Sequence, residues 1–333
     1  MKRKLFFLII VLSFVLVGCG KKTDKDILKE LTKKIENATS YYIEGNMDII
    51  NNEDTYNYQV NVSHKKEDYY KVYLKNQSNN HEQIILRNKD GVYVVTPSLN
   101  KSFKFQSEWP YNNSQVYLLK SIINDINNDE NKSFEEKDGY YIFTSKVNFP
   151  NNLKLNKQLV FIDKSLNIKE IQVLDENNNL QIKMTFNKID YKSEFKENYF
   201  ELNTNLESSI KDEENFKEVT SIEDVIYPMY LPTNTYLTSR DTVATDSGER
   251  LILTFDGDSP FMLIEETVKY EDEHITIPTY GTPDMLVDTI ATISDNSINW
   301  FSNGIEYYVI SDVLAKNELL DIARSISVIP VSK

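Results

Sequence analysis

The sequence has few of the residues that disulfides, metal sites and most catalytic centres require. It has one cysteine among 333 residues, which excludes an internal disulfide. It also lacks a Gly-x-Ser-x-Gly turn and a phosphate-binding loop. The three histidines lie far apart in the sequence, and none has a zinc-binding spacing: His64, His81 and His274. We therefore predict no catalytic residue, no metal and no cofactor, and we expect that the protein is not an enzyme.

Basic residues are scarce relative to acidic ones. The chain has 37 lysines and arginines against 51 aspartates and glutamates, a formal net charge of −14. Nucleic acids and anionic lipid head groups attract clustered positive charge, so we predict neither a nucleic-acid partner nor electrostatic membrane docking. Two acidic clusters, at 265–266 and 271–273, can in principle form an acid/base pair. In so acidic a chain they are better interpreted as solvated surface.

One long apolar run is present, near the N-terminus. Basic residues at 2–4 precede an apolar segment over 5–17, which is the order found in secretory signals. The segment is shorter than the ~20 residues of a membrane-spanning helix, so we expect it to be removed. The end of the run resembles the lipobox of bacterial lipoproteins: Leu16, Val17, Gly18 and Cys19. This resemblance implies cleavage before Cys19 and lipid on its thiol. The protein is then anchored on the outer face of the cytoplasmic membrane, because two acyl chains hold a protein stably.

The following part of the chain is predicted to contain one helix and then many short strands. Apolar residues recur at helical spacing over 27–35, with Asp26 as the expected cap. From residue 56 onward, alternation of apolar and polar residues predicts half-buried strands joined by hairpin turns. Helical spacing returns over 114–126, which predicts an inserted helix. The strands are expected at 56–63, 70–74, 83–87, 92–96, 102–106, 140–147, 158–163, 168–175 and 180–187.

A polar, charged stretch at 203–221 predicts a boundary between two domains. After it, a closing helix is expected, with Asn317 as its cap. The strands before that helix are predicted at 250–255, 261–268, 289–293, 298–302 and 306–310. The predicted organisation is a signal peptide at 1–18, a lipidated tether at 19–25, a domain at 26–205, a linker at 206–222 and a smaller domain at 223–333.

Residues 85–110 resemble the signature region of Gram-positive LolA-like lipoproteins, a group with the sporulation lipoprotein YdcC and the germination lipoprotein GerS. The resemblance covers residues 26–205. It implies an α+β fold in which a curved antiparallel sheet forms a half-open barrel covered by helices. Residues 227–329 are similar to a small α/β domain of unknown function found behind such modules. The concave face of such a sheet must be filled by helices, by a ligand or by a partner.

Aromatic residues near this signature are candidates for lining a cavity or a partner site, with core packing as the alternative: Tyr93, Phe103, Phe105, Trp109 and Tyr111. The resemblance implies a non-enzymatic lipoprotein of the forespore or mother-cell envelope that acts in sporulation or germination. It also implies a protein partner, such as a cortex-modifying amidase, or a lipid-like ligand bound through the curved sheet. The alternatives are a carrier of lipids or lipoproteins with an apolar cavity and, less favoured, a cell-wall enzyme.

Overall fold

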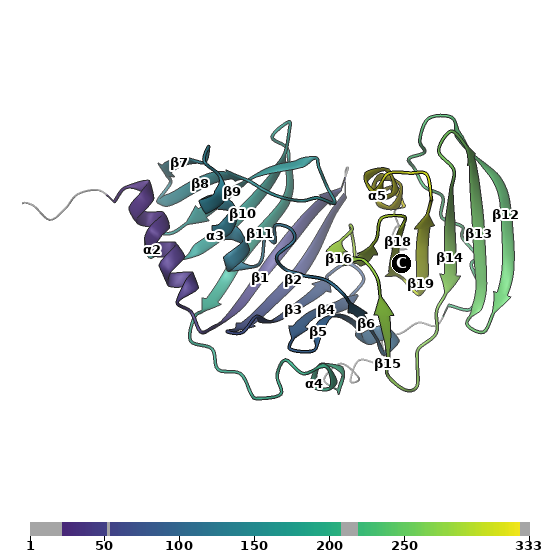
Figure 1. The fold of residues 1–333 in the computed structure, drawn as a ribbon, viewed down its shortest axis with the longest axis horizontal. Coiled ribbons are helices and arrows are strands. Elements are labelled where there is room, and N and C mark those ends of the chain that lie inside the picture. Colours follow the sequence, from purple (N-terminus) through teal and green to yellow (C-terminus); the bar gives the residue numbers. More distant parts are fainter. Residues whose placement is uncertain (1–21, 52–53, 208–218, 327–333) are drawn as a thin grey trace, which may run out of the picture.

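The larger of two sheets contains most of the N-terminal part of the chain. The computed structural model describes residues 22–51, 54–207 and 219–326 (Figure 1). The strands of this sheet are β1 (Ser40–Asn51), β2 (Asp54–Lys65), β3 (Tyr69–Asn76), β4 (Glu82–Asn88), β5 (Gly91–Thr96), β6 (Lys101–Phe105), β7 (Ser133–Lys137), β8 (Tyr140–Lys146), β9 (Leu155–Ile162), β10 (Ile168–Asp175), β11 (Leu180–Asp190) and β15 (Ile275–Thr279). Their order across the sheet is β15-β6-β5-β4-β3-β2-β1-β11-β10-β9-β8-β7.

This sheet is antiparallel and curved, as predicted. Each neighbouring pair is antiparallel except β15 and β6, which run parallel. Its strands bend around one concave side without closing into a full barrel (Figure 1). The alternation in β2 places Val60 and Val62 on the buried side and Gln59 on the exposed side. A two-residue turn with positive φ at Asp138 and Gly139 joins β7 to β8.

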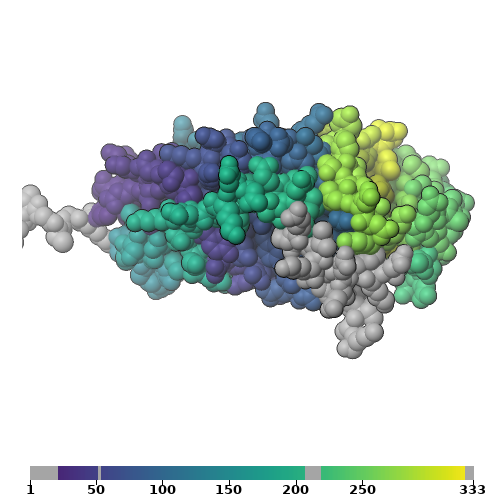
Figure 2. All heavy atoms as spheres, turned by 90° about the horizontal axis from the view of Figure 1, so that it is seen from below, coloured from purple at the N-terminus to yellow at the C-terminus, as the bar shows by residue number. Residues whose placement is uncertain are grey.

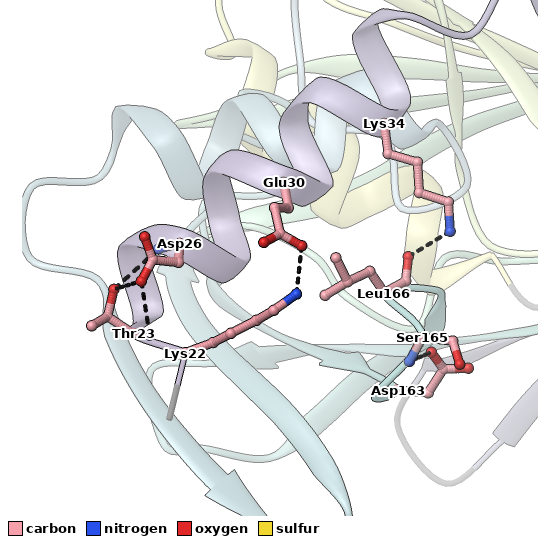
Figure 3. Close-up of polar contacts among 8 residues, drawn as sticks. All are labelled: Lys22, Thr23, Asp26, Glu30, Lys34, Asp163, Ser165 and Leu166. Atoms are coloured by element: carbon pink, nitrogen blue, oxygen red, sulfur yellow. Dashed lines mark hydrogen bonds and ion pairs between the residues drawn. The ribbon is translucent and has the colours of Figure 1, made fainter. Parts of the chain in front are cut away.

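Two helices cover the concave face, as predicted, but the second begins at Leu119 and not at residue 114. They are α2 (Asp24–Glu36) and α3 (Leu119–Asn128). The prediction that Asp26 caps α2 is wrong, because the cap is Thr23. Asp26 instead forms the second half of a capping box: its Oδ2 accepts a hydrogen bond from the Thr23 backbone at 3.2 Å (Figure 3). At the other end of α2, the Lys34 ammonium donates to the Leu166 carbonyl at 2.8 Å (Figure 3).

The second sheet is smaller and lies beside the first (Figure 1). Its order is β12-β13-β14-β19-β18-β17-β16, and α5 (Lys316–Ser325) packs on one face. The prediction of Asn317 as the cap of α5 is wrong. The N-cap is Ala315, whose N–H donates to Glu318 Oε2 at 3.1 Å. The strands are β12 (Thr235–Thr245), β13 (Gly248–Gly257), β14 (Phe261–Thr267), β16 (Thr282–Met285), β17 (Ile290–Ile293), β18 (Ser297–Ser302) and β19 (Ile305–Ile310).

The two sheets are joined through buried polar contacts. β15 belongs to the C-terminal part of the chain but pairs with β6, so it adds one strand to the edge of the larger sheet. Asp284 Oδ2 accepts hydrogen bonds from the Asn151 side chain at 2.7 Å and the Asn113 side chain at 3.3 Å. The Tyr58 hydroxyl donates to the Val287 carbonyl at 3.3 Å. The domain limits drawn from the sequence stay a prediction, and residues 208–218 of the expected linker lie outside the described part of the chain.

Candidate functional site: a polar cavity and an outer apolar groove

The concave face of the larger sheet is filled by the chain's own helices. The buried side chains of α2 and α3 form one core with the inward residues of the strands. These helical side chains are at most 1% exposed: Ile27, Leu31, Ile35, Leu119, Ile122, Ile123 and Ile126. Burial of each contributes about 1.5–3 kcal/mol to stability, so their removal from the sheet is unfavourable. Within the described residues, this packing leaves no apolar hollow for an acyl chain on that face.

A polar cavity of about 530 Å³ lies beside α3, at the edge of this core. One wall carries Tyr70 and the half-exposed ring of Tyr111. The guanidinium of Arg87 lies 5.3 Å from the centre of the Tyr111 ring and helps to hold it in place. Three of the remaining lining residues are apolar, namely Pro110, Leu118 and Val147, and the others are polar or charged: Asn113, Ser114, Lys120, Ser121, Asn124, Asp125, Asn128, Asp129, Glu130, Asn131, Lys146 and Asn148.

The two central carboxylates of this cavity differ in their environments. Burial raises the pKa of Asp125 to about 6, although the Gln158 amide donates to its carboxylate at 3.3 Å. Asp129 is held by two backbone N–H groups, those of Lys146 at 2.8 Å and Asn131 at 2.9 Å. Asp129 therefore has a structural role in closing the loop, and Asp125 and Glu130 are the other two acidic residues of the cavity lining.

His64 lies behind the cavity and does not have the geometry of an exposed acid or base. Its ring stacks on Tyr70 at 4.4 Å and lies 4.8 Å from the Tyr41 ring. Its Nδ1 is 3.0 Å from the Tyr69 carbonyl oxygen, and burial lowers its pKa to about 4. At neutral pH the imidazole is uncharged and forms part of the core.

A second hollow, of about 640 Å³, lies on the opposite, outer face of the same sheet. We call it the outer groove. Its apolar floor comes from β8 and β9, where Ile142 pairs with Phe161 and Leu159 lies one position further along the same face. Tyr140 packs edge-on against Phe161, with 6.3 Å between ring centres. Its rim is charged and contains both signs: Glu135, Lys137, Asp138, Lys169 and Glu170.

Another part of this outer face is already covered by the chain. Residues 194–207, which we call the outer strap, end in the helix α4 (Leu202–Glu207). They run across β3, β4 and β5 as part of the teal band in Figure 2. Phe200 of the strap packs with Leu86 and Tyr93, and the Tyr199 hydroxyl lies 2.9 Å from Ser63 Oγ. The outer face therefore has an apolar area at each side, one covered by the strap and one open at the outer groove.

Similarity to known proteins identifies the family. No family model matches the chain. The sporulation protein YdcC of Bacillus subtilis (strain 168) is 34% identical over 327 residues, which cover 97% of each chain. The chain belongs to the YdcC family of sporulation proteins. The resemblance found in residues 85–110 is thus confirmed, and the described fold has the LolA-like form, an open curved antiparallel sheet with helices on its concave side.

Solved structures similar to this YdcC-family chain are more distant. The MucA/MucB complex of Pseudomonas aeruginosa has 11% identity over 88% of this chain and 96% of the other, with a TM-score of 0.34. A LolA superfamily protein of Nitrosomonas europaea has 10% identity, and the match covers 55% of this chain and 100% of that protein, with a TM-score of 0.32. The structure of the CwlD amidase of Clostridioides difficile in complex with the GerS lipoprotein contains a chain with 15% identity. The match covers 54% of this chain and 100% of that chain, with a TM-score of 0.22. Scores this low identify no shared site.

In this YdcC-family chain, the five aromatic candidates do not form one site. Tyr93 lies on the outer face under the strap. Phe103 and Phe105 border a hollow of about 40 Å³ at the joint with the second sheet. Trp109 is buried on the concave side, whereas Tyr111 is 52% exposed at the polar cavity. Their role in binding stays a prediction. The lipobox residues Leu16, Val17, Gly18 and Cys19 lie outside the described part of the chain.

In this YdcC-family member, sequence reasoning found Tyr111 of the polar cavity but missed the other residues of its lining and the residues of the outer groove. A signal for the outer groove was present: residues 140–143 and 159–162 are apolar at every position, which is typical of strands buried on both faces. The cavity residues Asn124 and Asn128 gave no such signal, because they stand on the polar side of an amphipathic helix, where contact with water is the usual state.

Two findings concern metal binding and membrane-spanning helices. Over residues 22–51, 54–207 and 219–326, no group of three or more histidine, cysteine, aspartate or glutamate side chains is placed to hold a metal ion. In the same ranges, no helix combines the length and the apolar character needed to cross a membrane.

Proposed function

We propose that this protein is a non-enzymatic, membrane-anchored envelope lipoprotein that acts in sporulation or germination by binding a protein partner. The observation that carries the proposal is the outer groove. It leaves Leu159 and Phe161 partly exposed on a sheet face whose other apolar area is covered by the strap. Open apolar hollows with a polar rim are characteristic of interaction sites.

The strap indicates what kind of segment this face accepts. Phe195 and Phe200 of the strap lie 5.3 Å apart between ring centres and cover the apolar residues of β4 and β5. The outer groove has the same aliphatic and aromatic floor, so its partner presents a short segment with one or two large apolar side chains. The mixed charges of the rim favour a partner with both lysine and acidic residues beside that segment.

The anchoring part of the proposal depends on Cys19. Thr23 caps α2 only four residues after Cys19, and an extended chain spans at most ~3.6 Å per residue. A lipidated Cys19 thus keeps the start of α2 within roughly 15 Å of the lipid surface. The protein would then stand on the outer face of the cytoplasmic membrane of the forespore or mother cell, with the second sheet directed away from the anchor.

An acyl-chain carrier is less well supported. Such a protein needs an apolar cavity, whereas Leu31 and Ile122 fill the concave face and the cavity beside α3 is polar. Native mass spectrometry of the protein from membranes is the direct check, and stoichiometric lipid beyond the anchor would favour the carrier.

Crosslinked pull-down from sporulating cells tests partner binding. The substitutions Leu159→Lys and Phe161→Glu place charges in the outer groove on side chains that are partly exposed, so the fold is retained. We expect both to lose the partner, and a cortex amidase is the first partner to assay. Gln59→Lys, on the polar middle of the same face, is the matched control and retains the partner. Equal recovery with all variants would exclude the outer groove as the site.

Metabolic labelling with palmitate tests the anchor separately. The full chain incorporates label and sediments with membranes, and Cys19→Ser abolishes both. An unlabelled wild-type protein would overturn the anchoring.

A further inference from the structure

We propose that the polar cavity beside α3 binds a glycan built of N-acetylated amino sugars. The cavity is separate from the outer groove, because Tyr70 and α3 line it from the concave side of the sheet. Its volume of about 530 Å³ falls within the range of small-molecule sites, roughly 300–1,000 Å³.

Charge selects against ionic ligands. Lys120 and Lys146 face the cavity together with Asp125, Asp129 and Glu130. The two ammonium groups carry less positive charge than the three carboxylates carry negative charge. A polyanion such as a nucleotide phosphate therefore gains little electrostatic binding energy in this cavity. The acids also lack a metal-binding arrangement among the described residues. The remaining ligand chemistry is neutral and polar.

Side-chain amides make the cavity suited to hydroxyl and acetamido groups. Five asparagines line it, and each carboxamide can both donate and accept hydrogen bonds: Asn113, Asn124, Asn128, Asn131 and Asn148. In the described part of the chain, the side chains of Asn124 and Asn128 take part in no hydrogen bond with other residues. By contrast Asn127, which is not part of the cavity lining, donates to Thr32 Oγ1 at 3.2 Å. The two unused amides stand one helical turn apart on the wall of the cavity.

An aromatic surface completes the site. The Tyr111 ring is 52% exposed, and Arg87 lies 5.3 Å from its centre. A sugar ring presents C–H groups on one face and hydroxyls around its edge. We expect the sugar ring to stack on Tyr111 and its edge groups to form hydrogen bonds with other lining side chains, Asn124 and Asn128 among them.

Binding is measured by calorimetric titration of the full chain in detergent with the tetramer of N-acetylglucosamine. Cellotetraose, which has the same backbone without acetamido groups, is the matched ligand. We expect saturable binding of the tetramer and clearly weaker binding of cellotetraose. Asn124→Ala and Asn128→Ala each weaken binding by about two- to tenfold, the usual effect of one lost hydrogen bond, and Tyr111→Ala weakens it by roughly tenfold.

Asn127→Ala is the control variant, because it changes the same residue type on the same helix outside the cavity. It binds like the wild type, and circular dichroism checks that every variant is folded. Absence of saturable binding to the wild-type chain overturns the proposal. So does equal binding by the Asn124→Ala/Asn128→Ala double variant, because the glycan would then bind elsewhere. Neither outcome affects partner binding at the outer groove.

Discussion

The side-chain oxygen of Gln83 lies 2.7 Å from the backbone nitrogen of Ile290 and accepts its hydrogen bond. The same oxygen accepts a second bond from Thr289 Oγ1 at 3.0 Å, and the Gln83 amide donates to the Ile290 carbonyl at 3.5 Å. Gln83 stands on β4 of the larger sheet, whereas Ile290 begins β17 of the smaller one. One buried side chain thus satisfies the polar groups of a loop more than 200 residues away.

Substitution of Gln83 by alanine tests this contact between the two sheets. The change leaves the Ile290 N–H and Thr289 hydroxyl buried without their acceptor, so we expect a loss of about 1–3 kcal/mol in the free energy of unfolding. Urea denaturation followed by circular dichroism measures it. Gln59→Ala, an exposed glutamine in β2, stays within about 0.5 kcal/mol of wild type. Equal stability of both variants would show that the contact between the two sheets does not depend on Gln83.

Replacement of Thr23 by alanine tests the start of α2. The variant loses the Thr23 hydroxyl that accepts from the Asp26 N–H at 3.2 Å (Figure 3), and it lowers stability by about 1 kcal/mol. Thr23→Ser keeps an oxygen at this position and serves as the control. Thermal unfolding separates the two, and a serine variant as unstable as the alanine variant would contradict the role of the cap.

Truncation of Leu31 to alanine tests the filled concave face. Leu31 is fully buried between α2 and the sheet, so its removal leaves an apolar void and costs about 2–5 kcal/mol. Lys29→Ala, on the exposed side of the same helix, has little effect. Chemical denaturation provides the values. A cost below about 1 kcal/mol would indicate that the helix packs loosely and that the concave face can open.

The buried carboxyl of Glu265 makes the free energy of unfolding depend on pH. Burial raises its pKa from 4.5 to about 7, while the Ile226 N–H donates to Oε1 at 3.0 Å. The folded state therefore binds this proton more tightly than the unfolded state does, and the resulting stabilisation, fully present below pH 4.5, is lost as pH rises towards 7.

The substitution Glu265→Gln keeps an acceptor for Ile226 and removes the titration. Relative to wild type, we expect this variant to gain a few kcal/mol in unfolding free energy between pH 5 and pH 8, from about 1.4 kcal/mol per pKa unit. Denaturation at a series of pH values measures the difference. Glu273→Gln removes one carboxylate at an exposed position and is the matched control. A constant difference for Glu265→Gln would show that the carboxylate is not buried.

Local patterns predicted most of the elements but missed the central strand β1 and the edge strands β7, β12, β15 and β16. Alternation revealed β2, and helical spacing revealed α2 and α3, because in each case one face of the element is buried. The edge strand β12 was missed. Nearly all of its residues are exposed on both faces, so burial imposes no alternation on them. The strand β15 was missed for a different reason, since its pairing with β6 depends on a distant segment.

Most of the strands, and the sides of them that face inward, follow from the sequence alone, because the two-residue repeat of the strand is a local property of the backbone. The family also follows from the sequence, which is 34% identical to that of YdcC. The packing of α2 and α3 against the concave face and the contact between Gln83 and Ile290 arise only in the folded chain. The two hollows also depend on it. Such features arise where segments far apart in the chain meet, and the local pattern of residues does not specify that pairing.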